Sequence, residues 1–273
     1  MKKTILTLAA AFSIFACAEK ADDKKEATEG EAMSDSTQVA EKQQEEKITD
    51  PKVTEVWEPE PAVVTLDENG VPSDATVLFN GKDLSAWQSD SDENAEAAWT
   101  VNGDGSLTVA PGKGAIRTKD NFDSFQLHVE WQAPQKVEGE GQGRGNSGIF
   151  LQGLYEVQVL DSYENRTYSN GQASSLYKQH IPLANATKPT KEWQTYDIIF
   201  HEPKYDANGE RTKKGTVTVI HNGVLVQDHI ELEGTTEYIG HPQVKPHEDG
   251  PIILQDHGNT VSFRNIWLRE LED

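Results

Sequence analysis

The stretch 124–131 constrains the fold more than any other part of the chain, because its side chains alternate strictly between polar and apolar. Phe125, Leu127, Val129 and Trp131 fall on one face of an extended strand, and polar groups fall on the other. Successive side chains of a strand point to opposite faces, so this pattern predicts a strand with one buried face. The fold must therefore contain a sheet that packs against an apolar partner.

Strand patterns continue downstream of residue 75, and almost no helical period interrupts them. The Asn222-Gly223 pair between two apolar runs predicts a type I′ hairpin, because both residues tolerate positive φ. Many strands joined by short turns, without intervening helices, predict antiparallel sheets packed face to face, and a jelly-roll sandwich fits best. The other predicted strands are 98–101, 106–109, 147–151, 154–160, 195–200, 216–221, 224–228, 252–255 and 261–268.

The first seventeen residues have the pattern of a lipoprotein signal peptide. Two lysines precede an apolar run at 5–15, and the run ends at a small residue before Cys17, which is the one cysteine of the chain. The stretch 14–17 resembles a lipobox, so we expect Cys17 to be acylated and to become the mature N-terminus. An ordinary secretory peptide with an incidental cysteine is the alternative. Lipid would anchor an exported protein to the outer membrane, facing either the periplasm or the cell surface.

Residues 18–70 are rich in charged residues, alanine and glutamine and poor in aromatic ones, which predicts a disordered acidic tether because little apolar surface can be buried. The formal net charge of the chain is −21. Phosphate binding draws on lysine and arginine, so this charge argues against DNA or RNA as a partner. Residues 71–273 are long enough for one large β-sandwich domain.

The densest polar cluster lies between Arg144 and Asp161, and it includes the predicted strand 154–160. Glu156 and Gln158 are two residues apart and share one face, while Tyr155, Val157 and Val159 fill the other. This spacing predicts a sheet with one polar face. A solvated outer face that binds nothing is the alternative interpretation.

Asp161 follows Glu156 by five residues, so on a regular strand it would face the opposite way and joins Glu156 only if a bulge or the strand end intervenes. Two acidic side chains that flank an amide suit sugar chemistry: one carboxyl moves a proton, another stabilises charge, and the amide of Gln158 binds hydroxyls.

Further polar candidates lie in loops and turns. Lys178 belongs to a long segment with little regular pattern, and such loops on a rigid scaffold often bind ligands. His257 lies in a glycine-bounded turn and is a candidate acid, base or metal ligand, although loop histidines are commonly just exposed. No His-Glu-x-x-His arrangement occurs, so spacing names no metal site. Glu156, Asp161 and His257 could still meet one divalent cation in space.

Five motifs, in order along residues 75–271, resemble the 3-keto-disaccharide hydrolase family. They are Leu-Phe-Asn-Gly-Lys-Asp-Leu-Ser-Ala-Trp at 78–87, Gly-Asn-Ser-Gly-Ile-Phe-Leu at 145–151, Glu-Val-Gln-Val-Leu-Asp at 156–161, Trp-Gln-Thr-Tyr-Asp-Ile-Ile-Phe at 193–200 and Phe-Arg-Asn-Ile at 263–266.

The resemblance implies a concanavalin A-like jelly-roll sandwich that acts on glycosides already oxidised to a ketone at C3. A C3 carbonyl acidifies the C2 hydrogen, so a base can remove it, the C1 substituent can leave, and water added back completes a net hydrolysis. Two alternatives remain on the same fold. One is a carbohydrate-binding module without catalysis, and the other is a laminarinase-type retaining glycosidase with two carboxylates about 5 Å apart.

The keto-sugar chemistry needs a base near C2, an acid near the leaving oxygen and positive charge or donors at the enolate oxygen. We assign proton transfer to Glu156 or His257, and the developing oxyanion to Arg144, Lys178 or a metal ion. Asp161 would be a second carboxylate or a metal ligand. The side chains expected to bind sugar hydroxyls are Asn146, Gln158 and Gln255.

Overall fold

The computed structural model describes residues 48–272. The predicted signal peptide and Cys17 lie outside the described residues. The described residues belong to two units, 48–60 and 61–272. The described part of the first unit contains one 3₁₀ turn, η1 (Pro51–Thr54), which Asp50 caps by accepting a hydrogen bond from the Lys52 amide. Between residues 48 and 272 there is no helix with the length and apolar character needed to cross a membrane.

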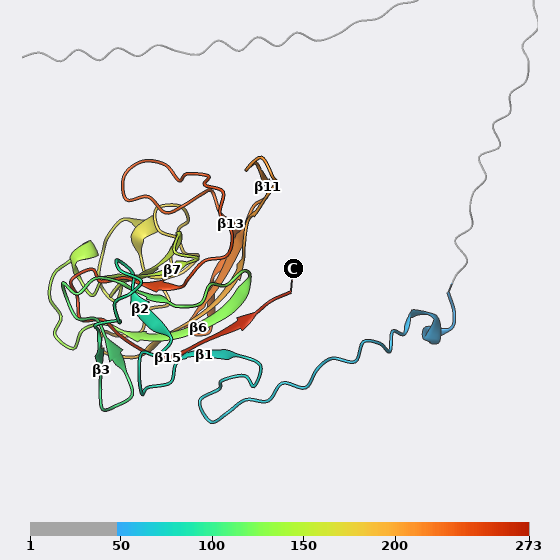
Figure 1. The fold of residues 1–273 in the computed structure, drawn as a ribbon, viewed down its shortest axis with the longest axis horizontal. Helices are drawn as coiled ribbons and strands as arrows, with labels where there is room; N and C mark the ends of the chain where they lie inside the picture. Colours follow the sequence, from blue (N-terminus) through green and yellow to red (C-terminus); the bar gives the residue numbers. More distant parts are fainter. Residues whose placement is uncertain (1–47, 273) are drawn as a thin grey trace, which may run out of the picture. The chain divides into compact units, whose positions relative to one another are not determined.

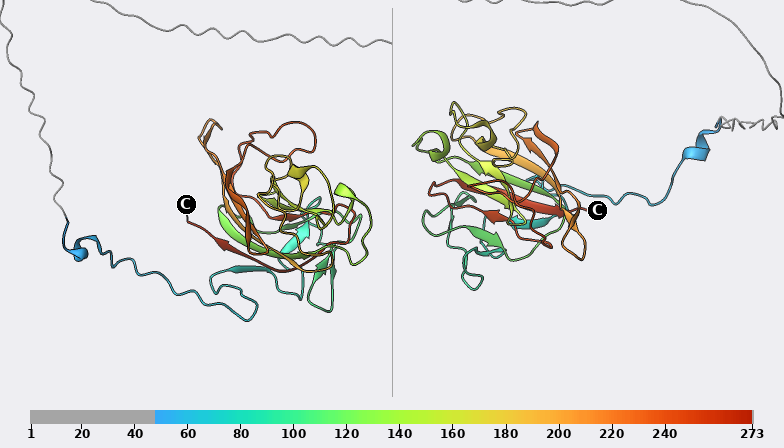
Figure 2. Two further views of the ribbon diagram at one scale, coloured as in Figure 1. Left: turned by 180° about the vertical axis from the view of Figure 1, so that it is seen from behind. Right: turned by 90° about the horizontal axis from the view of Figure 1, so that it is seen from above.

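The second unit is a sandwich of two antiparallel sheets, which confirms the predicted fold class (Figures 1 and 2). The larger sheet has the strand order β13-β12-β9-β6-β15-β4-β3, and β1 also pairs with β15. Its strands are β1 (Thr76–Phe79), β3 (Thr100–Val101), β4 (Leu107–Thr108), β6 (Phe125–Gln132), β9 (Gln194–His201), β12 (Thr216–His221), β13 (Val224–Glu231) and β15 (Ser262–Glu270).

The smaller sheet has the order β2-β5-β14-β7-β8. Its strands are β2 (Trp87–Ser89), β5 (Ile116–Thr118), β14 (Ile253–Leu254), β7 (Ser147–Leu151) and β8 (Tyr155–Val159). A separate hairpin joins β10 (Lys204–Tyr205) to β11 (Arg211–Lys213), and the short 3₁₀ turns η2 (Gly141–Gly143) and η3 (Ser169–Gly171) lie in loops. Strand β8 is an edge strand, a position that matters for the site described below.

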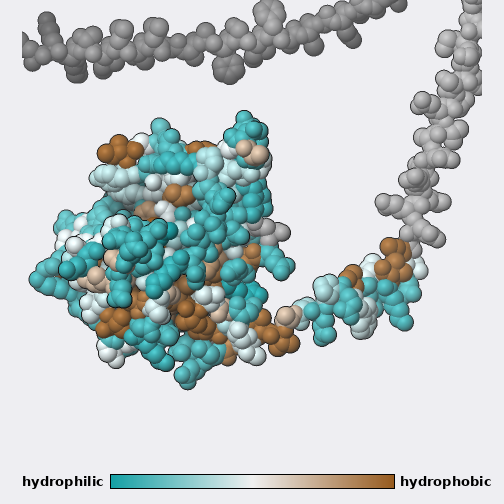
Figure 3. Space-filling model, in the orientation of Figure 1, coloured by the Kyte–Doolittle hydropathy of each residue, from teal (hydrophilic) through white to brown (hydrophobic). Residues whose placement is uncertain are grey.

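The core lies between the two sheets, and the alternation of β6 places it there. Phe125, Leu127, Val129 and Trp131 are fully buried, as predicted. Tyr155 from the smaller sheet contacts Phe200 from the larger one, with ring centroids 5.9 Å apart. Each such side chain contributes about 1.5–3 kcal/mol on burial. The face drawn in Figure 3 is mostly hydrophilic, with hydrophobic side chains scattered on it.

The predicted hairpin forms between β12 and β13. Asn222 and Gly223 adopt φ of 52° and 80°, the positive values that a type I′ turn needs. His221 and Val224 pair directly across the turn. The three-residue strands β2 and β5, and also β1, were not predicted, because runs this short hold too few alternations to stand out from loop sequence.

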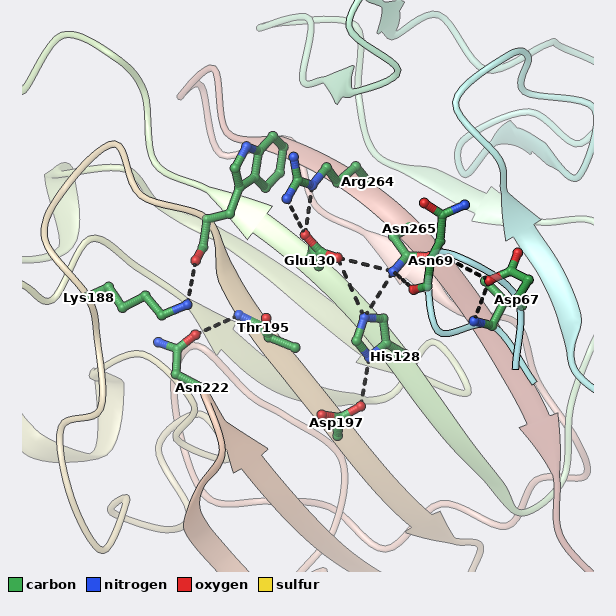
Figure 4. A network of polar contacts seen from close by, with 12 residues as sticks. Asp67, Asn69, His128, Glu130, Lys188, Thr195, Asp197, Asn222, Arg264 and Asn265 are labelled. Carbon is green, nitrogen blue, oxygen red and sulfur yellow. Dashed lines mark hydrogen bonds and ion pairs between the residues drawn. The ribbon is translucent and has the colours of Figure 1, made fainter. Parts of the chain in front are cut away.

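The outer face of the larger sheet carries a charged network (Figure 4). His128 Nδ1 lies 2.7 Å from Asp197 Oδ1, and Glu130 Oε2 lies 2.7 Å from both Nε and Nη2 of Arg264. Asn265, at a bulge in β15 with φ 47°, donates to Glu130 Oε1 at 3.1 Å. Every charged group of this network therefore has a partner.

The partners set the ionisation of the network. Burial works to lower the pKa of His128, but its contacts with Asp197 and Glu130 prevail and raise that pKa to about 9. The contact with His128, together with Asn265 and Arg264, lowers the pKa of Glu130 to about 2 despite partial burial. Both groups are thus charged near neutral pH.

Candidate functional site

The candidate site lies on the face of the smaller sheet that points away from the core. Strand β7 pairs with β8 so that Phe150 is opposite Glu156 and Gly148 is opposite Gln158. Strand β14 continues the sheet, and the backbone amide of Gln255 donates a hydrogen bond to the Gly148 carbonyl at 3.0 Å. Side chains at alternate positions share a face, so these residues from three strands face the same cavity.

A cavity of about 580 Å³ covers this sheet face, and we call it the Glu156 cavity. It is large enough for a small organic ligand. The residues that line it are Gln142, Asn146, Phe150, Glu156, Gln158, Tyr168, Tyr177, Thr236, Tyr238, Gln255 and His257. Glu156 is the one Asp or Glu among these described lining residues.

The Glu156 side chain is 5% exposed, and no described residue forms a hydrogen bond with its carboxyl group. Burial therefore raises its pKa to about 8, and the positive charge of Lys178 counters this only in part. Gly148 makes room for the carboxyl group, because a Cβ at that position would lie 2.6 Å from Glu156 Oε1. A buried carboxyl with a pKa near neutrality is suited to acid–base chemistry.

Two buried amide oxygens in this region have no hydrogen-bond partner among the described residues, Gln158 Oε1 and Gln255 Oε1. The Gln158 amide nitrogen donates to Gln142 Oε1 at 3.0 Å, which fixes the orientation of the side chain. A buried acceptor without a partner costs about 1–3 kcal/mol. A ligand rich in hydroxyl groups would relieve this cost, because each hydroxyl can donate to an amide oxygen.

One wall of the cavity is a returning loop that pairs with the free edge of β8. Ser174 donates through its amide to the Gln158 carbonyl at 2.9 Å, and Tyr177 donates to the Glu156 carbonyl at 2.9 Å. This pairing fixes Tyr177 directly beside Glu156. Lys178 and Ser174 adopt φ of 59° and 65°, left-handed conformations that are costly for residues other than glycine and that the surrounding hydrogen bonds hold in place.

Three tyrosines surround the ammonium group of Lys178. Its Nζ lies 4.3 Å from the ring centroid of Tyr238, 5.5 Å from that of Tyr177 and 6.0 Å from that of Tyr168. It also donates to the Tyr238 carbonyl. Lys178 stands behind the cavity wall rather than in the lining, and its charge reaches Glu156 through space.

The structure brings five of the predicted site residues to this cavity: Asn146, Glu156, Gln158, Gln255 and His257. Asn146 is buried and donates to the Gln142 carbonyl at 2.7 Å. His257 is exposed, which places it where the cavity opens to solvent.

The structure does not bring Arg144 and Asp161 to the Glu156 cavity, so the predicted grouping with Glu156 is corrected. Strand β8 ends at Val159, and beyond it Asp161 pairs with Arg144, with 2.9 Å between Oδ2 and Nε. Thr190 donates to the same carboxylate. Arg144 and Asp161 line a separate cavity of about 320 Å³. Their mutual ion pair holds together two loops instead.

A cation bound by Glu156, Asp161 and His257 together would require all three side chains to line one cavity. Asp161 lines a different cavity, so the three do not share a cation. Within residues 48–272 no group of three His, Cys, Asp or Glu side chains is arranged to hold a metal ion. A divalent ion in the Glu156 cavity would have to use Glu156, His257 and neutral oxygen donors.

The sequence patterns assign no role to the six other lining residues, which are Gln142, Phe150, Tyr168, Tyr177, Thr236 and Tyr238. Phe150 could have been found, because it shares the face of Glu156 once β7 and β8 are paired. The others lie in segments without a period, so no sequence signal places them at the cavity.

Comparison with known proteins assigns the chain to a family. Residues 74–269 match the model of the 3-keto-alpha-glucoside-1,2-lyase-like domain. The chain belongs to this family. The match spans the sandwich and includes every residue of the Glu156 cavity, which confirms the resemblance inferred from the sequence motifs.

Members and neighbours of the family include named proteins. A 3-keto-disaccharide hydrolase of Bacteroides thetaiotaomicron is 26% identical over 252 residues, which are 76% of this chain and 83% of that protein. A crystal structure from Parabacteroides distasonis, provisionally named a glycosyl hydrolase, is 55% identical with a TM-score of 0.78, covering 81% of this chain and 97% of its own. A second crystal structure from that organism, with the same provisional name, is 22% identical with a TM-score of 0.52, and the match covers 72% of this chain and 94% of that one. At this identity the likeness shows the fold alone.

Proposed function

We propose that the chain cleaves the glycosidic bond of uncharged 3-keto-glycosides in the Glu156 cavity. The observation that carries this proposal is the buried Glu156 carboxyl, which has no partner and a pKa near 8, among neutral amides and phenols. Family membership supports it, because the relative from Bacteroides thetaiotaomicron is named a 3-keto-disaccharide hydrolase.

The first step is removal of the C2 hydrogen by ionised Glu156. The C2–H bond breaks, C2=C3 forms, and the carbonyl electrons move to the C3 oxygen to give an enolate. A base with a pKa of about 8 suits a C–H bond that a neighbouring ketone acidifies. No ordinary glycoside offers such a hydrogen, so the base would act on the oxidised sugar alone.

The second step expels the C1 substituent. The enolate carbonyl re-forms, C1=C2 forms, and the C1–O bond breaks while the leaving oxygen takes a proton from His257 at the cavity mouth. Water then adds its oxygen to C1 and a proton returns to C2, so the sum is a hydrolysis. Unpaired Gln158 and Gln255 oxygens would accept hydrogen bonds from the sugar hydroxyls.

Aglycone release from a 3-keto-glucoside and from its unoxidised parent tests the proposal, with and without chelator. We expect turnover of the keto sugar alone. Turnover of the parent glycoside would point instead to a retaining glycosidase. Such an enzyme needs two carboxyl groups, and the described lining residues include only one. Loss of turnover with chelator, restored by a divalent ion, would show that the reaction depends on a metal.

A carbohydrate-binding module without catalysis is the second candidate, because unpaired amide oxygens would serve binding equally well. It predicts that the sugar binds and that no glycoside is cleaved. Calorimetry with the unoxidised glycoside, beside the turnover assay, separates the two functions.

We also propose that the protein works outside the cytoplasm, where a lipid on Cys17 anchors it to the outer membrane and the tether links this anchor to the domain. Replacement Cys17→Ala should move the protein from the membrane fraction to the soluble fraction and abolish labelling with a radioactive fatty acid. Retention of both would contradict the anchor.

A further inference from the structure

Tyr168 and Tyr177 form a hydroxyl couple on the wall of the Glu156 cavity. Their hydroxyl oxygens lie 2.6 Å apart, and both residues line the cavity. Two phenols have two protons between them and share one hydrogen bond, so the phenol that accepts keeps its own proton free to donate elsewhere. The couple therefore presents a donor beside the carboxyl of Glu156.

The couple stays protonated in the presence of its neighbours. Burial raises the pKa of Tyr177 above its ordinary value, and the charge of Glu156 adds to the effect. Burial and nearby Tyr238 and Glu156 likewise raise the pKa of Tyr168. Phenols of raised pKa remain hydrogen-bond donors at neutral pH rather than bases.

Lys178 supplies a positive charge behind this wall. Lys178 is the cation nearest to the couple in the contacts of the described chain, with its ammonium group over both rings. The pairing of Tyr177 with the Glu156 carbonyl fixes the couple relative to the base, and the left-handed backbone of Lys178 turns that side chain behind the wall. A donor held rigidly near a base is preorganised to stabilise the anion that the base creates.

We infer that the Tyr168–Tyr177 couple donates the hydrogen bond that stabilises the enolate oxygen on C3, an inference that rests on the proposed function. Glu156 takes the C2 proton, the carbonyl electrons move to oxygen, and the free phenol proton of the couple bonds to that oxygen without being transferred. The hydrogen bond weakens as the carbonyl re-forms and the C1–O bond breaks. The tyrosines are catalytic residues in this scheme, because they touch the reacting oxygen.

Hydrogen exchange at C2 tests this role separately from bond cleavage. The probe is the 3-keto derivative of 1,5-anhydroglucitol, which has no leaving group at C1, and NMR in D₂O follows replacement of its C2 hydrogen. Aglycone release from nitrophenyl 3-keto-glucoside is measured beside it. Both use the purified full chain.

We expect Tyr177→Phe to lower the exchange rate and kcat by about 10²–10³-fold, as loss of an oxyanion donor does, with KM changed only a few-fold. Tyr168→Phe should act in the same direction. The double variant should lose little more than the worse single variant, because the two hydroxyls act as one unit. Tyr163→Phe is the matched control, since Tyr163 lies outside the cavity lining, and it should keep wild-type rates.

The outcomes are distinguishable. Wild-type protein that neither exchanges nor cleaves would overturn the proposed function itself. If the wild-type protein is active and both Phe variants keep its exchange rate, the role of the couple is overturned and the proposed function stands. Lost cleavage with retained exchange would also overturn it, because the tyrosines would then serve the leaving group. If Tyr177→Phe fails to fold, Tyr168→Phe decides, because Tyr168 is exposed and its ring can be kept.

Discussion

Glu156 and Glu130 lie on strands of the two opposing sheets, both on faces that point away from the core, yet they are opposite in character. Glu130 contacts His128, Arg264 and Asn265, and its pKa falls to about 2. Glu156 has only the distant charge of Lys178, and its pKa rises to about 8. Both side chains point away from the core, so the difference lies in their partners and in the loops that cover Glu156 at the edge strand β8.

The same fold holds a carboxylate that serves stability and a carboxyl group that is suited to chemistry. A carboxylate with a full set of partners is a fixed charge that ties strands together, whereas a buried carboxyl without partners can gain or lose a proton near neutral pH.

The largest effect should come from Glu156→Gln. Without the base, kcat for the 3-keto-glucoside should fall at least about 10³-fold, in line with loss of a positioned acid–base group. The free energy of unfolding should stay the same or rise, because the buried carboxyl contributes no hydrogen bond. Turnover assays and urea unfolding measure the two quantities. A large loss of stability with retained activity would show that Glu156 is structural.

Asp161→Asn should reverse that pattern. Removing the charge leaves the partly buried Arg144 without its carboxylate partner, and loss of one partner of a buried ion pair typically costs about 3–5 kcal/mol of stability. Activity at a temperature where the variant is folded should fall only a few-fold, because Asp161 lies outside the Glu156 cavity. Urea unfolding beside steady-state kinetics measures both. A drop in kcat comparable to that of Glu156→Gln would restore Asp161 to the catalytic set.

Glu130→Gln should cost about 2 kcal/mol, the scale of a hydrogen bond to a charged group, and leave kcat unchanged. Arg264 and His128 lose the negative charge of their shared partner in this variant. Asp74→Asn, which disrupts the exposed pair with Arg269, serves as a control that should cost much less. Equal losses in the two variants would mean that the network adds nothing beyond a surface ion pair.

The two glutamates should give opposite pH dependences of stability. The folded-state pKa of Glu156 is raised from 4.5 to about 8, so the folded state binds more protons and stability falls as pH rises between these values. Glu130 has a folded-state pKa lowered from 4.5 to about 2, so its contribution is present above pH 4.5 and is lost as pH falls toward 2. Urea unfolding across pH, with each Gln variant subtracted from wild type, isolates each curve.

The smallest effect should come from Lys178→Gln. Loss of the positive charge moves the pKa of Glu156 upward, so the rising limb of kcat/KM against pH should move to higher pH. The plateau rate should change little compared with Glu156→Gln. A pH–rate profile measures the inflection, and an inflection that stays in place would show that Lys178 does not influence the base.

The sequence was informative wherever side chains alternate along a strand. The alternation along the eight residues of β6 predicts its buried face, and the spacing of Glu156 and Gln158 predicts the polar face of β8. Pairing of β14 with β7 then brings Gln255 to the same face. These positions follow from a period of two, which the sequence displays directly.

The sequence was uninformative where strands end. Asp161 comes two residues after β8, and nothing local specifies that the chain turns it toward Arg144. Tyr168 and Tyr238 lie in loops whose course depends on long-range hydrogen bonds, such as the one from Lys178 to the Tyr238 carbonyl. Tertiary contacts of this kind leave no periodic trace.

Gly148 offers a marker for reading other chains of this architecture. Its missing side chain is the space that the carboxyl group of Glu156 occupies, so alanine or anything larger there would displace the acid. A homologous sequence that keeps the Glu-x-Gln spacing but has a bulky residue opposite the glutamine should retain sugar affinity and lack turnover. A single position on a neighbouring strand could thus sort enzymes from lectin-like descendants.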